Sequence, residues 1–270
     1  MKTTKINHLI SILIPVYNCE EYVCDTIDSV LSQTHKNIEV IIVDDCSTDN
    51  SLQLIKKYKD TRIRLYENNT NLGRPKTFNR LLDLMDKKSK YFTFIGSDDV
   101  VTKELIKDKI KYLEEHKDIY GLGSSIDYVD SDLSFIKNKK YQLRNDEIKN
   151  TFLINSPFSQ GGMLLRAELK NYKFNEKYKV CIDYELWCRL ISKYYMFENL
   201  PGTYYYHRQH EGQAKQKNLK LTIWNTIKIK SNYLFKPKYF SLKALIRYTM
   251  EIGLLFIPKK IILWLFYKIK

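Results

Sequence analysis

Two apolar segments of this 270-residue chain end in paired aspartates. Residues 38–43 (IEVIIV) run into Asp44-Asp45, and residues 91–95 (YFTFI) run into the segment 96–99 (GSDD). β-Branched and aromatic residues dominate both segments, which predicts two buried strands. Acids at the end of a buried strand are costly unless a cation meets them. A divalent metal that carries a phosphorylated substrate fits this need, because hard cations prefer carboxylate oxygen.

Strand and helix signals alternate through the first half of the chain. Strands are predicted at residues 9–16, 38–43, 62–66 and 91–95, and each is followed by a segment with apolar residues at helical spacing. Such alternation predicts an α/β fold, with a Rossmann-like, mostly parallel sheet and helices on both faces. After residue 119 the pattern loosens, and residues 130–150 are polar and lysine-rich, which favours a surface loop or a short helix.

The aspartates of both pairs also have a structural interpretation. Asp44 or Asp45 could order the turn near Ser47, and Asp98 or Asp99 could cap the helix that follows. In open parallel sheets, however, ligands bind beyond the carboxyl ends of the strands. Two pairs at the ends of two strands therefore favour a functional site.

The net charge of +14 is unevenly distributed. Residues 215–270 hold thirteen Lys or Arg and one acid, whereas residues 1–214 hold 32 basic and 30 acidic residues. The body is thus nearly neutral and its candidate site is acidic, which argues against a nucleic-acid-binding protein and predicts no nucleic-acid partner. The five cysteines form no CxxC pair, and no signal peptide precedes the first strand, so we expect a cytoplasmic protein.

The segments SILIPVYNCEEY, IEVIIVDDCSTDNS, NLGRPKTFN and YFTFIGSDD, in this order, resemble the nucleotide-binding half of the family 2 glycosyltransferases of bacterial surface glycans, which have the GT-A fold. The resemblance covers residues 9–130 and continues more loosely to about residue 210. It implies a GT-A domain at residues 1–214, followed by a basic amphipathic helical tail at residues 215–270. Within the domain, residues 1–130 would bind the nucleotide sugar and residues 131–214 the acceptor.

The resemblance also implies roles for individual residues. Asp45 would accept a hydrogen bond from the base, which suits the imide N–H of uracil. Asp98 would contact the ribose side, and Asp99 would hold the Mn²⁺ or Mg²⁺ that bridges the diphosphate. The residues expected to bind the nucleotide sugar are Pro15, Val16, Tyr17, Asp45, Arg74, Ser97, Asp98 and His210.

The chain departs from the family pattern at Thr77-Phe78-Asn79, where the family usually has A-R-N. Phe78 replaces an arginine that would meet the diphosphate. Arg74 or Lys76 could supply the missing cation, and the alternative is that both are solvated loop charges. The segment 206–210 (YHRQH) resembles the family's Y-R-x-H segment, so His210, with Arg208 nearby, would close over the diphosphate.

The segment 181–187 (CIDYELW) resembles the family's E-D-x-x-L-W stretch, in which the aspartate is the general base. Asp183 takes that role, although Ile182 replaces the usual glutamate. The alternatives are that Asp183 caps the following helix, or that Glu185 is the base. Trp187 is interpreted as a core residue rather than an acceptor-stacking one.

Residues 241–270 combine apolar blocks with lysines, and neither block approaches the ~20 residues of a membrane-spanning helix. Interfacial binding fits this composition better, with Trp264 and Phe266 in the bilayer surface and cations beside anionic lipid. The protein would then lie on the inner face of the cell membrane. The alternative is that these helices pack on the body or on another subunit.

The sequence thus predicts an inverting, metal-dependent glycosyltransferase. It would use a nucleoside diphosphate sugar, with UDP as the expected nucleotide, and a glycan or polyprenyl-linked acceptor. A nucleotidyltransferase is the alternative enzyme class, but the chain lacks a glycine-rich triphosphate loop after the first strand. A catalytically impaired sugar-nucleotide-binding protein is a further alternative, because Phe78 and Ile182 both depart from the family pattern at positions expected to serve the reaction.

Overall fold

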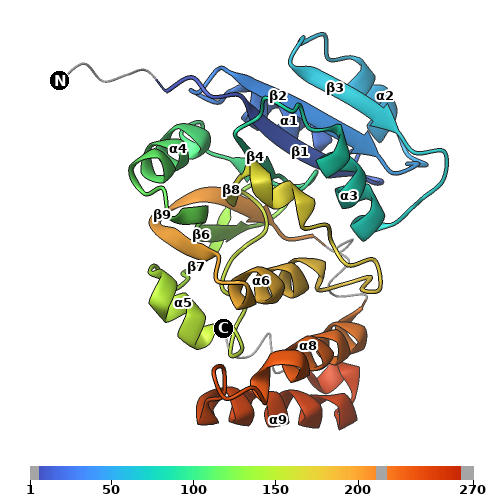
Figure 1. Ribbon diagram of the computed structural model, residues 1–270. Helices are drawn as coiled ribbons and strands as arrows, with labels where there is room; N and C mark the ends of the chain where they lie inside the picture. Colours follow the sequence, from blue (N-terminus) through green and yellow to red (C-terminus); the bar gives the residue numbers. More distant parts are fainter. Residues whose placement is uncertain (1–5, 211–217, 263–270) are drawn as a thin grey trace.

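The computed structural model describes residues 6–210 and 218–262 (Figure 1). One sheet passes through the molecule in the order β3-β2-β1-β4-β8-β6-β9-β5, with β7 paired to β6. The strands are β1 (Ile10–Val16), β2 (Ile38–Asp44), β3 (Ile63–Glu67), β4 (Tyr91–Phe94), β5 (Val100–Val101), β6 (Ile119–Val129), β7 (Phe135–Lys139), β8 (Leu164–Arg166) and β9 (Met196–Arg208). The helices are α1 (Val23–Leu31), α2 (Ser51–Lys56), α3 (Arg74–Leu84), α4 (Leu105–Glu115), α5 (Asn145–Thr151), the 3₁₀ helix η1 (Ala167–Asn171), α6 (Ile182–Ser192), α8 (Leu219–Leu234) and α9 (Leu242–Phe256).

The first four strands are parallel, as predicted, and β1 lies between β2 and β4. Val16 at the end of β1 pairs with Asp44, and Leu13 pairs with Phe94 at the end of β4. The two strands that carry the acid pairs therefore flank one central strand and end at the same edge of the sheet.

The second half of the sheet is mixed. The short strand β8 pairs antiparallel with both β4 and β6, whereas β9 runs parallel to β6 and antiparallel to β5. Parallel pairing therefore dominates only the part of the sheet formed by β1 to β4. The polar stretch 130–150, expected to be a loop or a short helix, forms the exposed strand β7 and the helix α5.

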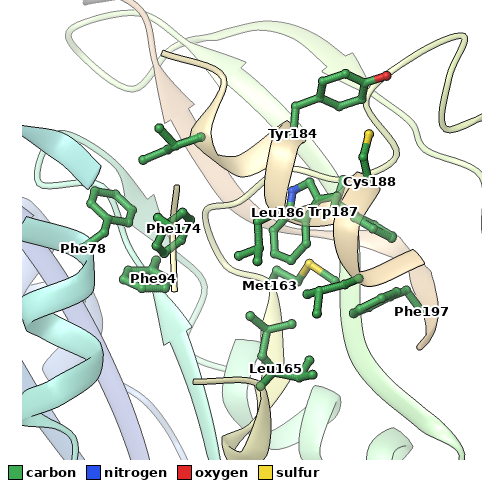
Figure 2. Close-up of a cluster of buried hydrophobic side chains, with 14 of the residues drawn as sticks. Phe78, Phe94, Met163, Leu165, Phe174, Tyr184, Leu186, Trp187, Cys188 and Phe197 are labelled. Carbon is green, nitrogen blue, oxygen red and sulfur yellow. The ribbon is translucent and has the colours of Figure 1, made fainter. Parts of the chain in front are cut away.

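Alternate residues of β1 face opposite sides of the sheet. Ile12 and Ile14 pack in one core cluster with residues of α1, α2 and α4. Leu13 packs in the other cluster, with residues of α3 and α6. Figure 2 shows part of this second cluster, where Phe78 of α3 lies against Phe94 and Phe174 and where Trp187 lies near Phe197.

The described part of the predicted tail forms a C-terminal helical extension, α8 and α9, beside α6 (Figure 1). Ile229 and Leu234 of α8 belong to the same core cluster as Trp187 of α6, so α8 is joined to the body by its core. Between the two helices, the buried Lys230 lies 2.7 Å from Glu251, which also accepts from Arg247. Trp264 and Phe266 lie outside the described residues. Among the described helices, none has the length and hydropathy to cross a membrane.

Candidate active site

Asp99 is buried at the carboxyl edge of the sheet, with 4% of its surface exposed. The hydroxyl of Tyr205 donates to Asp99 Oδ2, and the backbone N–H of Arg208 donates to Oδ1 at 2.9 Å. His207 Nδ1 lies 3.0 Å from Oδ1 and 3.2 Å from Oδ2. All three donors come from the end of β9, so β9 holds Asp99 in place.

Tyr205 reaches Asp99 because two glycines leave room for its ring. A Cβ at Gly161 would lie 2.1 Å from the Tyr205 ring, and Gly162 adopts a φ of +74°, which a side chain would strain. The backbone N–H of Gly96 donates to the Tyr205 hydroxyl at 3.0 Å. Burial, together with the charge of Asp99, raises the pKa of Tyr205, so the hydroxyl stays protonated and can donate.

Asp98 is more open, with 26% of its side chain exposed. His210 Nε2 lies 3.1 Å from Asp98 Oδ2, and the His210 ring packs 5.0 Å from the ring of Tyr22. Burial opposes ionisation of Asp98, but the hydrogen bond from His210 and the nearby charge of His207 outweigh it and lower the pKa. The structure thus brings His210 to the aspartate pair.

Arg208 does not extend over the site as a lid residue would. Its side chain is 2% exposed, and its guanidinium lies 2.7 Å from Asp25 of α1 and 4.4 Å from the ring centre of Tyr22. Nε donates to the backbone oxygen of Asp98 at 3.0 Å. Arg208 therefore ties β9 to α1 and to the aspartate segment.

The carboxylate of Asp45 organises the loop before α3. Oδ1 accepts from Asn68 at 2.6 Å and from the Leu72 N–H at 2.8 Å, and Oδ2 accepts from the Gly73 N–H at 2.9 Å. Asp45 therefore orders the loop before α3, whereas the turn near Ser47 is held by Asp44. A carboxylate has about four acceptor positions, so one remains for a ligand.

Asp44 is 1% exposed, and its Oδ2 accepts from the Ser47 N–H at 2.9 Å. Its Oδ1 is buried and has no hydrogen-bond partner among the described residues. A buried carboxylate oxygen without a donor is costly. It is therefore a second position at this edge that could accept an N–H.

The first strand ends beside these acids. Val16 is buried, and its backbone oxygen accepts from the Asp45 N–H at 2.8 Å, whereas the next residue, Tyr17, is 49% exposed. The backbone oxygen of Ser97 lies 2.8 Å from the hydroxyl of Thr26, which anchors the aspartate segment to α1. Pro15, which pairs with Val43, completes the edge.

Phe78 is a core residue, which explains the departure from the family pattern. It is 4% exposed and stacks on Phe94 at 4.8 Å, so an arginine here would be buried among aromatic rings. Arg74 begins α3, is exposed, and lies 5.6 Å from the Phe78 ring. Arg74 can therefore present a cation at this end of α3.

Asp183 lies in the first turn of α6, and Cys181 rather than Asp183 is the N-cap residue. The N-cap alternative is therefore wrong. Burial raises the pKa of Tyr141, and the charges of Tyr128 and Asp183 raise it further. Burial and the charge of Asp99 raise the pKa of Tyr128 in turn. Tyr128 is therefore sensitive to the charge of Asp99, and Tyr141 to that of Asp183. No sequence motif singles out either tyrosine.

The two other candidates on α6 have structural roles. Glu185 is 9% exposed and lies 3.0 Å from Arg189 one turn later. Trp187 is 1% exposed and packs edge-on against Phe158, which confirms its interpretation as a core residue. Asp183 is therefore the acid of this helix that remains for chemistry.

The donor set at this edge fits a divalent cation that shares its ligands with a substrate. Asp98 offers a partly exposed, ionised carboxylate, whereas the three β9 donors occupy Asp99. Within residues 6–210 and 218–262, no group of three or more His, Cys, Asp or Glu side chains is arranged to hold a metal by itself. Phosphate oxygens and water would have to complete the coordination.

A hollow of about 690 Å³ lies at the opposite edge, around Glu39 near the start of β2. Its polar groups are paired internally, because Glu39 lies 2.6 Å from Arg64 and accepts from the Asp86 N–H at 2.8 Å. It offers no functional carboxylate.

Residues 11–171 match the family model described as Glycosyl transferase family 2. A protein of Escherichia coli named UDP-Glc:alpha-D-GlcNAc-diphosphoundecaprenol beta-1,3-glucosyltransferase WfaP is 31% identical over 224 residues, which cover 83% of this chain and 86% of that protein.

Two solved structures share the fold. Staphylococcus aureus TarS in complex with UDP-GlcNAc gives a TM-score of 0.63 at 22% identity, covering 90% of this chain and 79% of that one. Mannosyltransferase PcManGT of Pyrobaculum calidifontis, in complex with GDP-Man and Mn²⁺, gives 0.64 at 12% identity, covering 98% and 81%. The match to another TarS crystal structure covers 64% of the length of that TarS chain. These likenesses confirm the predicted GT-A fold.

Proposed function

This chain belongs to glycosyl transferase family 2 and is a glycosyltransferase, and we propose that it passes a sugar from a UDP-sugar to a hydroxyl group of a glycan or lipid-linked glycan. The main support is the carboxyl edge of the sheet, where Asp45 follows β2 and Asp98 and Asp99 follow β4 on either side of β1. Residues 1–130 would bind the donor, and residues 131–214 the acceptor.

The proposed donor site begins at the end of β1. Pro15, Val16 and Tyr17 line the nucleotide, and the remaining acceptor position of Asp45 takes the imide N–H of uracil. The name of WfaP contains UDP-Glc, and the TarS complex contains UDP-GlcNAc. Both support a UDP-sugar as the donor. Ser97 and Asp98 meet the ribose side, and Arg74 and His210 meet the diphosphate.

The proposed reaction is a direct displacement that inverts the anomeric carbon. Asp183 accepts the proton of the acceptor hydroxyl as the hydroxyl oxygen forms its bond to that carbon. The bond from the sugar to the diphosphate breaks, and the diphosphate leaves with the electron pair. His210 and Arg74 stabilise the charge that develops on the leaving group.

We assign the cofactor role to Mn²⁺ or Mg²⁺, bound at Asp99 with Asp98 beside it. A divalent cation would neutralise the charge that develops on the leaving diphosphate. The fold neighbour PcManGT was crystallised with Mn²⁺, which agrees with this assignment. Because His207 and Tyr205 now occupy Asp99, binding there requires that His207 release the carboxylate.

We further propose that the protein is cytoplasmic and touches the inner face of the cell membrane through residues 241–270, of which the last eight lie outside the described residues. Leu242, Ile246 and Met250 of α9 are each more than half exposed. They lie four positions apart, so they share one face of the helix, and lysines flank it. The name of WfaP, which contains diphosphoundecaprenol, agrees with a lipid-linked acceptor.

A donor screen tests the enzymatic proposal. Release of nucleoside diphosphate is measured with UDP-, GDP- and dTDP-sugars, with Mn²⁺, with Mg²⁺ and with EDTA. We expect slow hydrolysis of one or more UDP-sugars that EDTA abolishes. Hydrolysis confined to GDP-sugars would overturn the assignment of uracil to Asp45, and hydrolysis in EDTA would overturn the metal assignment.

Flotation with vesicles tests the membrane proposal. The full chain should float with phosphatidylglycerol vesicles at low salt and less well with phosphatidylcholine. Exchanging both Leu242 and Met250 for serine should reduce flotation. Surface variants are needed, because deleting α8 would expose Ile229 and Leu234, which belong to the body core. Equal flotation of wild type and variant would reject this face.

A further inference from the structure

A groove of about 480 Å³ lies between the two helices of the C-terminal extension. Its walls are mainly apolar and aromatic: Trp224, Ile227, Tyr248, Ile252, Leu255 and Phe256, with Lys228 and Ser231 beside them. Trp224 is 55% exposed and Phe256 is 85% exposed. Large aromatic side chains left in water beside an apolar groove mark a binding surface.

The groove lies in a strongly cationic part of the molecule. Residues 218–262 contain nine Lys or Arg and one acid, Glu251. Glu251 is buried and already accepts from Lys230 and Arg247, so the surface of α8 and α9 is positive. A partner of this face is therefore anionic as well as apolar. A second copy of the same face would bring like charges together.

The helix α8, which forms one wall of the groove, contacts the residues that precede α6. Lys228, which lines the groove, lies with its Nζ 6.0 Å from the centre of the Tyr178 ring. On the same helix, Asn225 donates to the backbone oxygen of Val180 at 3.2 Å. The groove and the start of α6 are thus joined through α8.

From these observations we infer that the groove binds a polyprenyl chain whose phosphate end meets Lys228. The inference rests on the proposed function, because it assigns the lipid part of a lipid-linked acceptor to this groove. The apolar walls would hold the isoprene units, and the lysine ammonium would meet the phosphate as a point charge. The glycan end of the acceptor would then lie on the side of α8 that contacts residues 178–181.

Direct binding of undecaprenyl phosphate tests the inference. The radiolabelled lipid is offered to the full chain in nonionic detergent micelles, with no donor sugar present. Undecaprenol, which lacks the phosphate, and phosphatidylglycerol are offered in parallel. We expect saturable binding of undecaprenyl phosphate and weaker binding of the other two. Because no donor is used, a failed donor screen would leave this result intact.

Two matched pairs of variants locate the binding. Trp224→Ser with Phe256→Ser removes two exposed aromatic rings from the groove, and Phe135→Ser with Phe240→Ser removes two exposed rings away from its walls. The first pair should weaken binding about tenfold or more, because it removes apolar contact area, and the second should change it less than about twofold. Thermal unfolding checks that both variants fold.

The charge is tested in the same way. Lys228→Ala should weaken binding of undecaprenyl phosphate about tenfold and leave undecaprenol unchanged, whereas Lys243→Ala, an exposed site outside the groove, should affect neither. Equal loss in both aromatic variants, or equal affinity for phosphatidylglycerol, would overturn the inference. So would a dimer, seen by light scattering, that dissociates when Phe256 is replaced, because a second copy would then occupy the groove.

Discussion

The hydroxyl of Tyr205 donates to the carboxylate of Asp99 and accepts from the backbone N–H of Gly96. One phenol thereby fixes both ends of the segment 96–99. The contact joins the last long strand of the sheet to the carboxyl end of β4. The position of the acid that we propose as a metal ligand therefore depends on a residue outside the predicted motifs.

Removal of that hydroxyl should impair both stability and activity. Tyr205→Phe keeps the ring in the space beside Gly161 but leaves the Gly96 N–H without its partner. We expect a loss of about 1–3 kcal/mol in the free energy of unfolding and a higher Mn²⁺ concentration for half-maximal activity. Urea unfolding and metal titration measure the two effects. Tyr204→Phe is the control, because its hydroxyl contacts Asp108, on α4. An equal effect of both variants on the metal titration would contradict this prediction.

Replacement of the proposed base should stop transfer without preventing donor binding. Asp183→Asn keeps the size and position of the side chain in the first turn of α6 but cannot accept the proton. We expect kcat to fall about 10²- to 10⁴-fold, with UDP affinity unchanged by calorimetry. Glu185 is another acid of the same helix and accepts from Arg189. The variant Glu185→Gln should therefore retain most activity. An active Asp183→Asn enzyme would exclude Asp183 as the base.

Local patterns predicted the first half of the fold well. The strands that end at Val16, Asp44 and Phe94 are short apolar runs, each bounded by polar or turn residues, so their signals are contained in neighbouring residues. The second half depends on pairings between distant residues. The insertion of β8 between β4 and β6 has no signature in any window of the sequence.

The candidate site divides in the same way. The aspartates belong to local motifs and were found, whereas Tyr205 contacts Asp99 over 106 positions. No local motif indicates this contact. Phe78 shows a further limit of sequence-based prediction. Its departure from the family motif is explained only by its packing against Phe94 and Phe174, which are distant in the sequence.

Removing the contact between His207 and Asp99 should distinguish two arrangements of the proposed metal site. If Asp99 binds the metal, His207 must first release it, so His207→Ala should leave unchanged or lower the Mn²⁺ concentration for half-maximal activity. If Asp98 is the ligand and Asp99 only positions it, the same variant should raise that concentration. We expect the first outcome. Metal titration of the UDP-sugar hydrolysis rate decides between them, with Asp99→Asn expected to lose the metal response.

Lys109 should make stability depend on pH. Its amine is fully buried, donates to Ser124 and to the backbone oxygen of Gly162, and burial lowers its pKa to about 7. The amine of the unfolded chain titrates near its ordinary value, so between the two pKa values the unfolded state binds more protons than the folded state. The free energy of unfolding should therefore rise with pH from about 7 to about 10, by about 1.4 kcal/mol per pH unit at most.

This contribution is isolated by comparing Lys109→Met with wild type in urea unfolding from pH 7 to pH 9. Lys109→Met should change the slope of the free energy of unfolding against pH. Lys107→Met, at an exposed site on the same helix, should keep the wild-type slope. Parallel pH profiles for wild type and Lys109→Met would show that the buried amine does not titrate in this range.

The C-terminal extension should affect the turnover number through the start of α6. Asn225 of α8 is 7% exposed and donates to Val180, and Cys181, the next residue, adopts a left-handed conformation with φ 61° at the N-cap. The Asn225 contact therefore holds the turn that sets the direction of Asp183. Asn225→Ala should lower kcat about tenfold while leaving the KM for the UDP-sugar within about twofold, because misplacement of a base by even a small distance affects only the reacting geometry. Asn232→Ala, exposed on the same helix, is the matched control. A fall in UDP affinity equal to the fall in kcat would show instead that α8 supports the whole fold and not the base in particular.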